Sequence, residues 1–162
     1  MAFHLGVVAL LAVTLQLLAT FFPFGSSDLP RRILFVASYL ALFVFVAANL
    51  RRPGLVILGV GLALNFLAIV TNGGLMPTTA EAFTRTGELP ANARLGHWLP
   101  HSKDVLLERS NVHLYFLADR LTIGGQHIVR VFSVGDSFVA AGLLVTVAEL
   151  MSPRISRRAP NS

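Results

Sequence analysis

Four stretches of the chain are almost wholly apolar, and polar, turn-forming sequence separates them. They cover approximately residues 2–22, 33–50, 54–71 and 134–151. Each is close to the roughly 20 apolar residues that a helix needs to cross the hydrocarbon core of a bilayer. The pattern predicts an all-α membrane protein with about four transmembrane helices in a single domain, residues 1–153. We expect residues 154–162 to form a disordered basic tail.

Residues typical of membrane boundaries lie at the ends of these stretches. Arg31 and Arg32 precede the second stretch and Arg51 and Arg52 follow it, so these side chains can reach the two headgroup layers. Pro53 suits the first turn of the third helix. No Lys or Arg precedes the first stretch, which is longer than the roughly 7–15 apolar residues of a signal peptide. We therefore expect it to remain as the first helix.

A long polar loop, residues 78–130, separates the third and fourth stretches. It contains the chain's only tryptophan, Trp98, and most of its charged residues. Residues 111–117 within it are apolar but too short to span a bilayer, which predicts a short interfacial or re-entrant segment.

Composition agrees with a membrane location. Hydrophobic residues make up 54% of the chain and charged residues 13%, about half the share usual in soluble domains. The net charge of +5 comes mainly from basic residues at the ends of apolar stretches and in the loop. That placement favours lipid headgroups over nucleic acid as the partner, and no nucleic-acid-binding motif is present. The chain has no cysteine, so it has neither disulfides nor thiolate chemistry.

The distribution of arginine predicts the orientation. With the N-terminus inside, Arg51, Arg52 and the three arginines of the tail lie on the inner side, against Arg31 and Arg32 outside. Cytoplasmic loops are enriched in such residues. We expect a multi-pass protein of the cell membrane, with both termini in the cytoplasm and the long loop outside.

Small and polar residues share one face of the third stretch at helical spacing: Gly54, Gly61, Asn65, Ala68 and Asn72. A polar amide is costly in lipid, so Asn65 should face other helices and form hydrogen bonds there. The face is either a helix-packing surface or a surface that contacts a ligand.

The third stretch ends in the sequence Asn72-Gly73-Gly74-Leu75-Met76-Pro77. Two glycines release the backbone from helical geometry, and Pro77 disfavours the α region at Met76. This pattern predicts a turn at the membrane surface. Such a turn is either a simple glycine helix stop or a place where exposed amides and carbonyls bind an ion or phosphate.

The fourth stretch begins with Ser133 and Asp136, which have the spacing of a capping box. In the alternative interpretation, Asp136 is a carboxylate at the membrane edge that binds a cation or proton, or pairs with Arg120 or Arg130.

A second small-and-polar face follows in the same stretch, with Gly135, Gly142, Thr146 and Glu149. It is a plausible partner for the face that carries Asn65. Glu149 is close to Arg154 in sequence, which predicts an ion pair at the surface.

Four histidines lie in the loop: His97, His101, His113 and His127. Pro100 disfavours a helix that carries both His97 and His101, and no ligand set of known spacing is present. Neither a nucleophile elbow nor a nucleotide-binding fingerprint occurs. We expect no metal, no cofactor and no catalytic residue.

Several short motifs together resemble a known family. They are Asn65-Phe66, Asn72-Gly73-Gly74-Leu75-Met76-Pro77, Leu117-Ala118-Asp119 and Phe132-Ser133-Val134-Gly135-Asp136. In this order they resemble a family of small bacterial integral membrane proteins classed as a domain of unknown function. The resemblance implies a bacterial multi-pass membrane protein and carries no activity. One departure is Arg120 after Asp119, where such proteins often continue with an apolar residue.

The favoured function is a small membrane module that binds a lipid headgroup or small ligand, or partners another membrane protein. A solute or ion carrier, acting as a homo-oligomer, is the second hypothesis. A lipid-modifying enzyme that uses His113 or His127 with Asp119 is the third. The candidate ligand-binding residues are Asn65, Asn72, Gly73, Gly74, Asp119, Ser133, Gly135 and Asp136.

Overall fold

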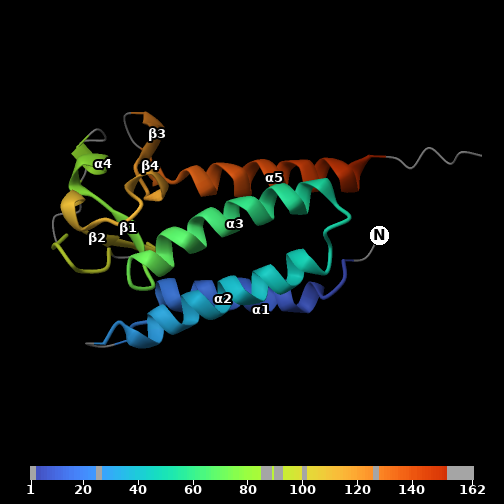
Figure 1. Ribbon diagram of the computed structural model, residues 1–162, viewed down its shortest axis with the longest axis horizontal. Coiled ribbons are helices and arrows are strands. Elements are labelled where there is room, and N and C mark those ends of the chain that lie inside the picture. The colour runs from blue at the N-terminus through green and yellow to red at the C-terminus, as the bar shows by residue number, and fades with distance from the viewer. Residues whose placement is uncertain are drawn as a thin grey trace, which may run out of the picture.

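Four long helices lie side by side along the long axis of the computed structural model, which describes residues 3–24, 27–84, 89, 93–99, 102–125 and 128–152. The short helix α4 and the strands gather at one end of these helices, and the N-terminus and the α2–α3 turn lie at the other (Figure 1). The long helices are α1 (Gly6–Phe21), α2 (Leu29–Ala47), α3 (Pro53–Thr71) and α5 (Val134–Met151).

Three helices, α2, α3 and α5, are long and apolar enough to cross a membrane. The first helix, α1, is also apolar but has only 16 residues. At 1.5 Å per residue it rises about 24 Å, which is less than the roughly 30 Å of a hydrocarbon core. The described structure thus supports three of the four expected spans.

Glycines allow α3 and α5 to pack closely, as the two small-residue faces predict. A Cβ atom on Gly61 would lie 2.5 Å from the carbonyl oxygen of Gly135. Cβ atoms on Gly54 and Gly142 would likewise overlap Thr146 and the backbone of Leu58. Small residues let helices approach until their backbones touch, and the resulting van der Waals packing is one of the forces that hold helices together in lipid.

The long loop is not free of β-structure, so the all-α expectation is wrong in this part. Strand β1 (Met76–Thr78) pairs in parallel with β2 (Asp104–Leu106), and β3 (Leu121–Gly125) pairs antiparallel with β4 (Ile128–Phe132). Strands of three residues are too short for an alternating pattern to be recognised, and the parallel pair joins segments far apart in sequence. Helix α4 (Ala80–Thr84) follows β1.

The apolar part of the loop forms two short 3-10 helices, η1 (Arg109–Asn111) and η2 (Tyr115–Leu117). Leu114, between them, has a left-handed backbone conformation. Leu117 is buried, and η2 contacts both α3 and α5. This segment is therefore fastened to the loop-side end of the helices, and its depth in a bilayer stays a prediction.

Candidate functional site

A single lysine forms the centre of a charged cluster where the loop covers the helices. Lys103 Nζ lies 2.7 Å from Asp136 Oδ2, at the start of α5, and 3.2 Å from Asp119 Oδ2, which follows η2. Lys103 itself directly precedes β2. Because an ammonium group is compact and has three donors, it can bridge two carboxylates that approach from different directions.

Asp136 serves as both a helix cap and an ion-pair partner. Its backbone N–H donates to Ser133 Oγ at 2.9 Å, and its Oδ2 accepts from the Ser133 backbone N–H at 3.2 Å, so the predicted capping box is confirmed. The same side chain pairs with Lys103 rather than with Arg120 among the described ion pairs; the side chain of Arg130 lies outside the described part. Asp136 is therefore a helix cap, as the first interpretation expects, and its ion-pair partner is a lysine that the second interpretation did not name.

Asn65 connects α3 to this cluster. Its Nδ2 donates to Asp136 Oδ1 at 2.7 Å, and its Oδ1 accepts from Ser133 Oγ at 2.7 Å. A Cβ atom on Gly135 would overlap the Asn65 amide oxygen, so glycine is needed at that position. Asn65 is buried and paired, as the cost of an amide in lipid requires.

Asp119 is enclosed completely. Its backbone N–H donates to the Pro77 carbonyl at 3.0 Å, and its own carbonyl accepts from Thr78 Oγ1 at 2.8 Å, so β1 fixes its position. Among the described residues, neither carboxylate oxygen has a hydrogen-bond partner, although Lys103 lies within ion-pair distance. Asp104 is also buried.

The charges in the cluster alter proton affinity. Burial raises the pKa of Asp119 well above its usual range; Lys103 opposes this effect, and Asp104 and Asp136 strengthen it. Burial alone would lower the pKa of Lys103, but Asp119 and Asp136 outweigh it, so that pKa lies well above the usual value. Lys103 is therefore an ammonium ion at neutral pH, and Asp119 is the carboxyl group most ready to hold a proton.

A cavity of about 260 Å³ lies beside this cluster. Polar side chains reach it from three parts of the chain: α1, α2 and the segment before β2. The lining residues are Gln16, Leu17, Thr20, Phe35, Tyr39, Ser102 and Lys103. Hydroxyl, amide and ammonium groups thus meet in one hollow at the loop-side end of the helices.

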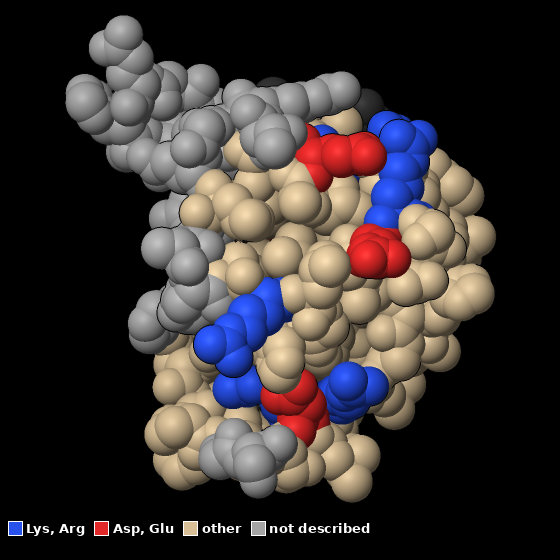
Figure 2. Space-filling view, turned by 90° about the vertical axis from the view of Figure 1, so that its left-hand side faces the viewer, with Lys and Arg blue, Asp and Glu red and all other residues tan. Residues whose placement is uncertain are grey.

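Charged side chains elsewhere on the loop-side end lie in small groups of both signs between uncharged side chains (Figure 2). One exposed pair joins Arg109 to Glu81 at 3.2 Å. Exposed pairs of this kind contribute about 0–1 kcal/mol. The cluster around Lys103 differs from these pairs, because it places a charged group against the fully buried Asp119 and against Asp136, which is only about 30% exposed.

Of the eight candidate ligand-binding residues named from the sequence, the fold brings five to this cluster: Asn65, Asp119, Ser133, Gly135 and Asp136. The other three lie elsewhere. Asn72 holds the loop, because its Oδ1 accepts from the His113 backbone N–H at 2.9 Å and its Nδ2 donates to the His113 carbonyl at 2.8 Å.

Gly73 and Gly74 form the predicted turn, with φ of 76° and 92°. The Gly73 carbonyl accepts from Arg32 Nη1 at 2.8 Å, and both glycines line a separate groove along α2. The turn therefore fastens α3 to α2 and does not contribute to the cavity at Lys103.

Lys103, Asp104 and Tyr39 were not among the sequence candidates. The sequence nevertheless marks Lys103 as unusual. It is the only lysine in a chain with twelve arginines, and it lies between two polar residues, Ser102 and Asp104. Tyr39 gave no signal, because an aromatic residue in an apolar helix is usually part of the core.

Other expectations concern residues at the edge of, or beyond, the described chain. His113 is exposed, and His101 and His127 lie outside the described residues. Within the described part, no group of three or more His, Cys, Asp or Glu side chains could hold a metal ion. Glu149 Oε1 accepts from the Gly54 backbone N–H at 2.9 Å; its expected partner, Arg154, lies outside the described residues.

Comparison with known proteins gives a family and no activity. Neither the curated proteins nor the solved structures contain a match to this chain. Residues 1–148 match the model of the Family of unknown function (DUF5317). Since the match covers most of the 162 residues, the chain belongs to this family.

Proposed function

We propose that this protein is a multi-pass membrane protein that binds a small neutral or zwitterionic molecule, such as a dipolar lipid headgroup, in the cavity beside Lys103. The observation that carries the proposal is the enclosed ionic cluster next to a hollow lined by hydrogen-bonding side chains. Burying charged groups costs several kcal/mol each unless they are paired well. Such a cluster at the end of an apolar bundle is typical of a functional site.

The charge balance favours a ligand without net negative charge. Three carboxyl groups, from Asp104, Asp119 and Asp136, surround the one ammonium of Lys103. The negative charges would repel an anion. A hydroxyl, an amide or a dipolar headgroup has no net charge and would not be repelled overall. Tyr39 and Thr20 add hydroxyl groups that both donate and accept hydrogen bonds.

The size and position of the cavity support a small ligand that comes from the bilayer. Its volume of about 260 Å³ lies just below the roughly 300–1,000 Å³ of sites for drug-sized molecules. Its walls include Leu17 of α1 and Phe35 of α2, so the hollow lies between two apolar helices. A headgroup could enter there while its acyl chains stay in lipid.

Binding accounts for these residues better than catalysis does. A lysine whose pKa is raised stays protonated and is a poor nucleophile or base. The carrier and the lipid-modifying enzyme remain the two other candidates. A carrier predicts transport across a sealed vesicle, and an enzyme predicts a changed lipid product.

The test is native mass spectrometry of the full chain, released from nanodiscs that contain phosphatidylethanolamine or phosphatidylglycerol. We expect the share of retained lipid that is lost on mutation of the cavity, in Tyr39→Phe or Thr20→Val, to be larger for the zwitterionic lipid than for the anionic lipid. Tyr39→Phe removes one hydroxyl and should weaken retention about fivefold, the effect of roughly 1 kcal/mol from one hydrogen bond.

Matched controls make the result specific. Tyr115→Phe removes a hydroxyl in η2, away from the cavity lining, and should leave retention unchanged. Thr20→Val should weaken retention, whereas Thr14→Val, on the exposed face of the same helix, should not. Equal retention by wild type, Tyr39→Phe and Thr20→Val would refute the proposed site.

A further inference from the structure

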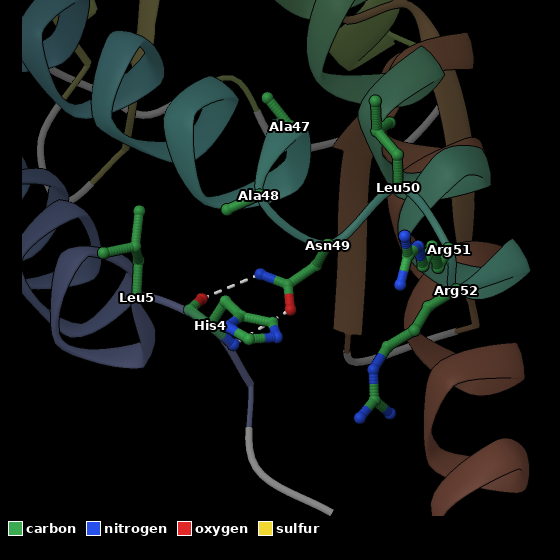
Figure 3. A pocket seen from close by; sticks show the side chains of 8 residues that line it. All are labelled: His4, Leu5, Ala47, Ala48, Asn49, Leu50, Arg51 and Arg52. Atoms are coloured by element: carbon green, nitrogen blue, oxygen red, sulfur yellow. Dashed lines mark hydrogen bonds between the residues drawn. The ribbon is translucent and has the colours of Figure 1, made fainter.

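A second cavity, of about 680 Å³, lies at the end of the helices opposite the loop. It is formed where the N-terminal segment meets the α2–α3 turn, and none of its lining residues belongs to the cluster at Lys103. Figure 3 shows the side chains that line it: His4, Leu5, Ala47, Ala48, Asn49, Leu50, Arg51 and Arg52.

The side chain of Asn49 fixes the shape of this cavity by joining its two walls. Its side chain is 5% exposed; Nδ2 donates to the carbonyls of His4 and Phe45, each at 2.8 Å, and Oδ1 accepts from the His4 backbone N–H at 3.0 Å. These bonds tie the segment before α1 to the end of α2 (Figure 3). Leu5, which directly precedes α1, has a left-handed backbone conformation that is unfavourable for a residue other than glycine. The segment is thus held in place despite this cost.

The lining of the cavity divides into a cationic part and an apolar part. Arg51 and Arg52 supply two guanidinium groups, and His4 adds an imidazole. Leu5 and Leu50 are both more than half exposed, so the apolar part is open to the surroundings of the bundle.

No ion pair of Arg51 or Arg52 is found within the described part of the chain. The guanidinium of Arg52 instead lies 4.4 Å from the centre of the Phe3 ring. Glu149 is the acidic residue near this end of α3, and its Oε1 already accepts from the Gly54 backbone N–H. Arg51 and Arg52 are adjacent in sequence and both line the cavity, which favours an anion there, because each guanidinium can offer several N–H donors to phosphate oxygens.

We infer that this cavity binds the phosphate of an anionic phospholipid. Arg51 and Arg52 bind the phosphate, and Leu5 and Leu50 contact the glycerol and the start of an acyl chain. The apolar part distinguishes this occupant from a free phosphate ion, which would gain nothing from it. The inference uses the membrane placement proposed above but involves the opposite end of the helices and a ligand of opposite charge preference.

The test is a titration of delipidated full-length protein in neutral detergent, followed by native mass spectrometry. The probes are short-chain phosphatidylglycerol, short-chain phosphatidylcholine and inorganic phosphate. We expect the binding that depends on Arg51 and Arg52 to be at least about tenfold tighter for phosphatidylglycerol than for phosphatidylcholine. The double variant Arg51→Gln/Arg52→Gln should lose this preference, and Arg51→Lys/Arg52→Lys should keep part of it.

The control is Arg94→Gln/Arg109→Gln, which removes two exposed arginines of the loop and changes the net charge equally. Unchanged phosphatidylglycerol affinity in Arg51→Gln/Arg52→Gln, or an equal loss in the control, would overturn the site. Binding of inorganic phosphate as tight as that of phosphatidylglycerol would overturn the lipid as occupant. Retention of phosphatidylethanolamine by these variants, measured as for Tyr39→Phe, separates a failure here from a failure of the Lys103 site.

Discussion

Replacing Lys103 with methionine tests whether the ionic cluster holds the loop onto the helices. Methionine keeps the apolar stem of lysine and removes the charge that pairs with Asp119 and Asp136. Removing one partner of a fully buried ion pair typically costs about 3–5 kcal/mol. Here Asp119 is fully buried, whereas the side chains of Lys103 and Asp136 are 28% and 30% exposed, so solvent screens part of this cost. Asp136 keeps its bonds to Asn65 and Ser133, and Asp119 can take up a proton, so we expect a loss near the lower limit, about 3 kcal/mol at neutral pH.

The same variant has a definite pH dependence. The pKa of Asp119 is raised in the folded state, so folding binds a proton, and the stability linked to this group falls as pH rises through that pKa. Without Lys103, which opposes the shift, the pKa of Asp119 rises further. The destabilisation by Lys103→Met should therefore be smaller at pH 5 than at pH 8.

Equilibrium unfolding in mixed micelles, followed by the fluorescence of Trp98, measures this effect, because Trp98 is the chain's only tryptophan and lies in the loop. Lys103→Met/Asp119→Asn should recover part of the lost stability, since it also removes one uncompensated carboxylate. Arg109→Gln, which breaks an exposed pair, should cost less than about 1 kcal/mol. A Lys103→Met protein as stable as the wild type at pH 8 would show that the cluster is not a buried ion pair.

Three further predictions concern Asp136, Gly142 and the orientation. Asp136→Asn keeps a capping group but loses the charge that pairs with Lys103, so it should be less stable than the wild type and more stable than Asp136→Ala in the same unfolding assay; equal stability of the two variants would contradict a separate role for the cap. Gly142→Val places a side chain against Leu58 and should lower the midpoint of thermal unfolding, whereas Leu144→Val, on the exposed face of α5, should change it little. Reporter fusions after residues 52 and 158 should report the cytoplasm and a fusion near residue 87 the outside; a cytoplasmic signal at residue 87 would invert the orientation.

Local sequence was sufficient to locate the long helices, but not all of their ends, because α2 runs over Leu29–Ala47 where residues 33–50 were expected. Apolar runs long enough to span a bilayer predict α2, α3 and α5 because helix formation and lipid burial depend on neighbouring residues. The cap formed by Ser133 and Asp136 joins residues three apart in sequence, so it was predictable. The turn at Gly73 was predictable too, because glycine by itself allows the positive φ found there. The helical spacing of small residues in each made the packing of α3 on α5 a plausible expectation, while leaving contact with a ligand as the alternative.

Only the tertiary structure decided which polar groups meet. Lys103 and Asp136 are 33 residues apart, and Asn65 and Asp136 are 71 apart, with no periodic pattern to connect them. Their meeting depends on β1 pairing with β2, which brings the segment before β2 over the end of the bundle. Three-residue strands have too little sequence to predict such a pairing, because their stability comes from burial in the assembled loop. The sequence alone therefore determined where the helices lie, and the folded loop determined that a half-buried lysine would join them.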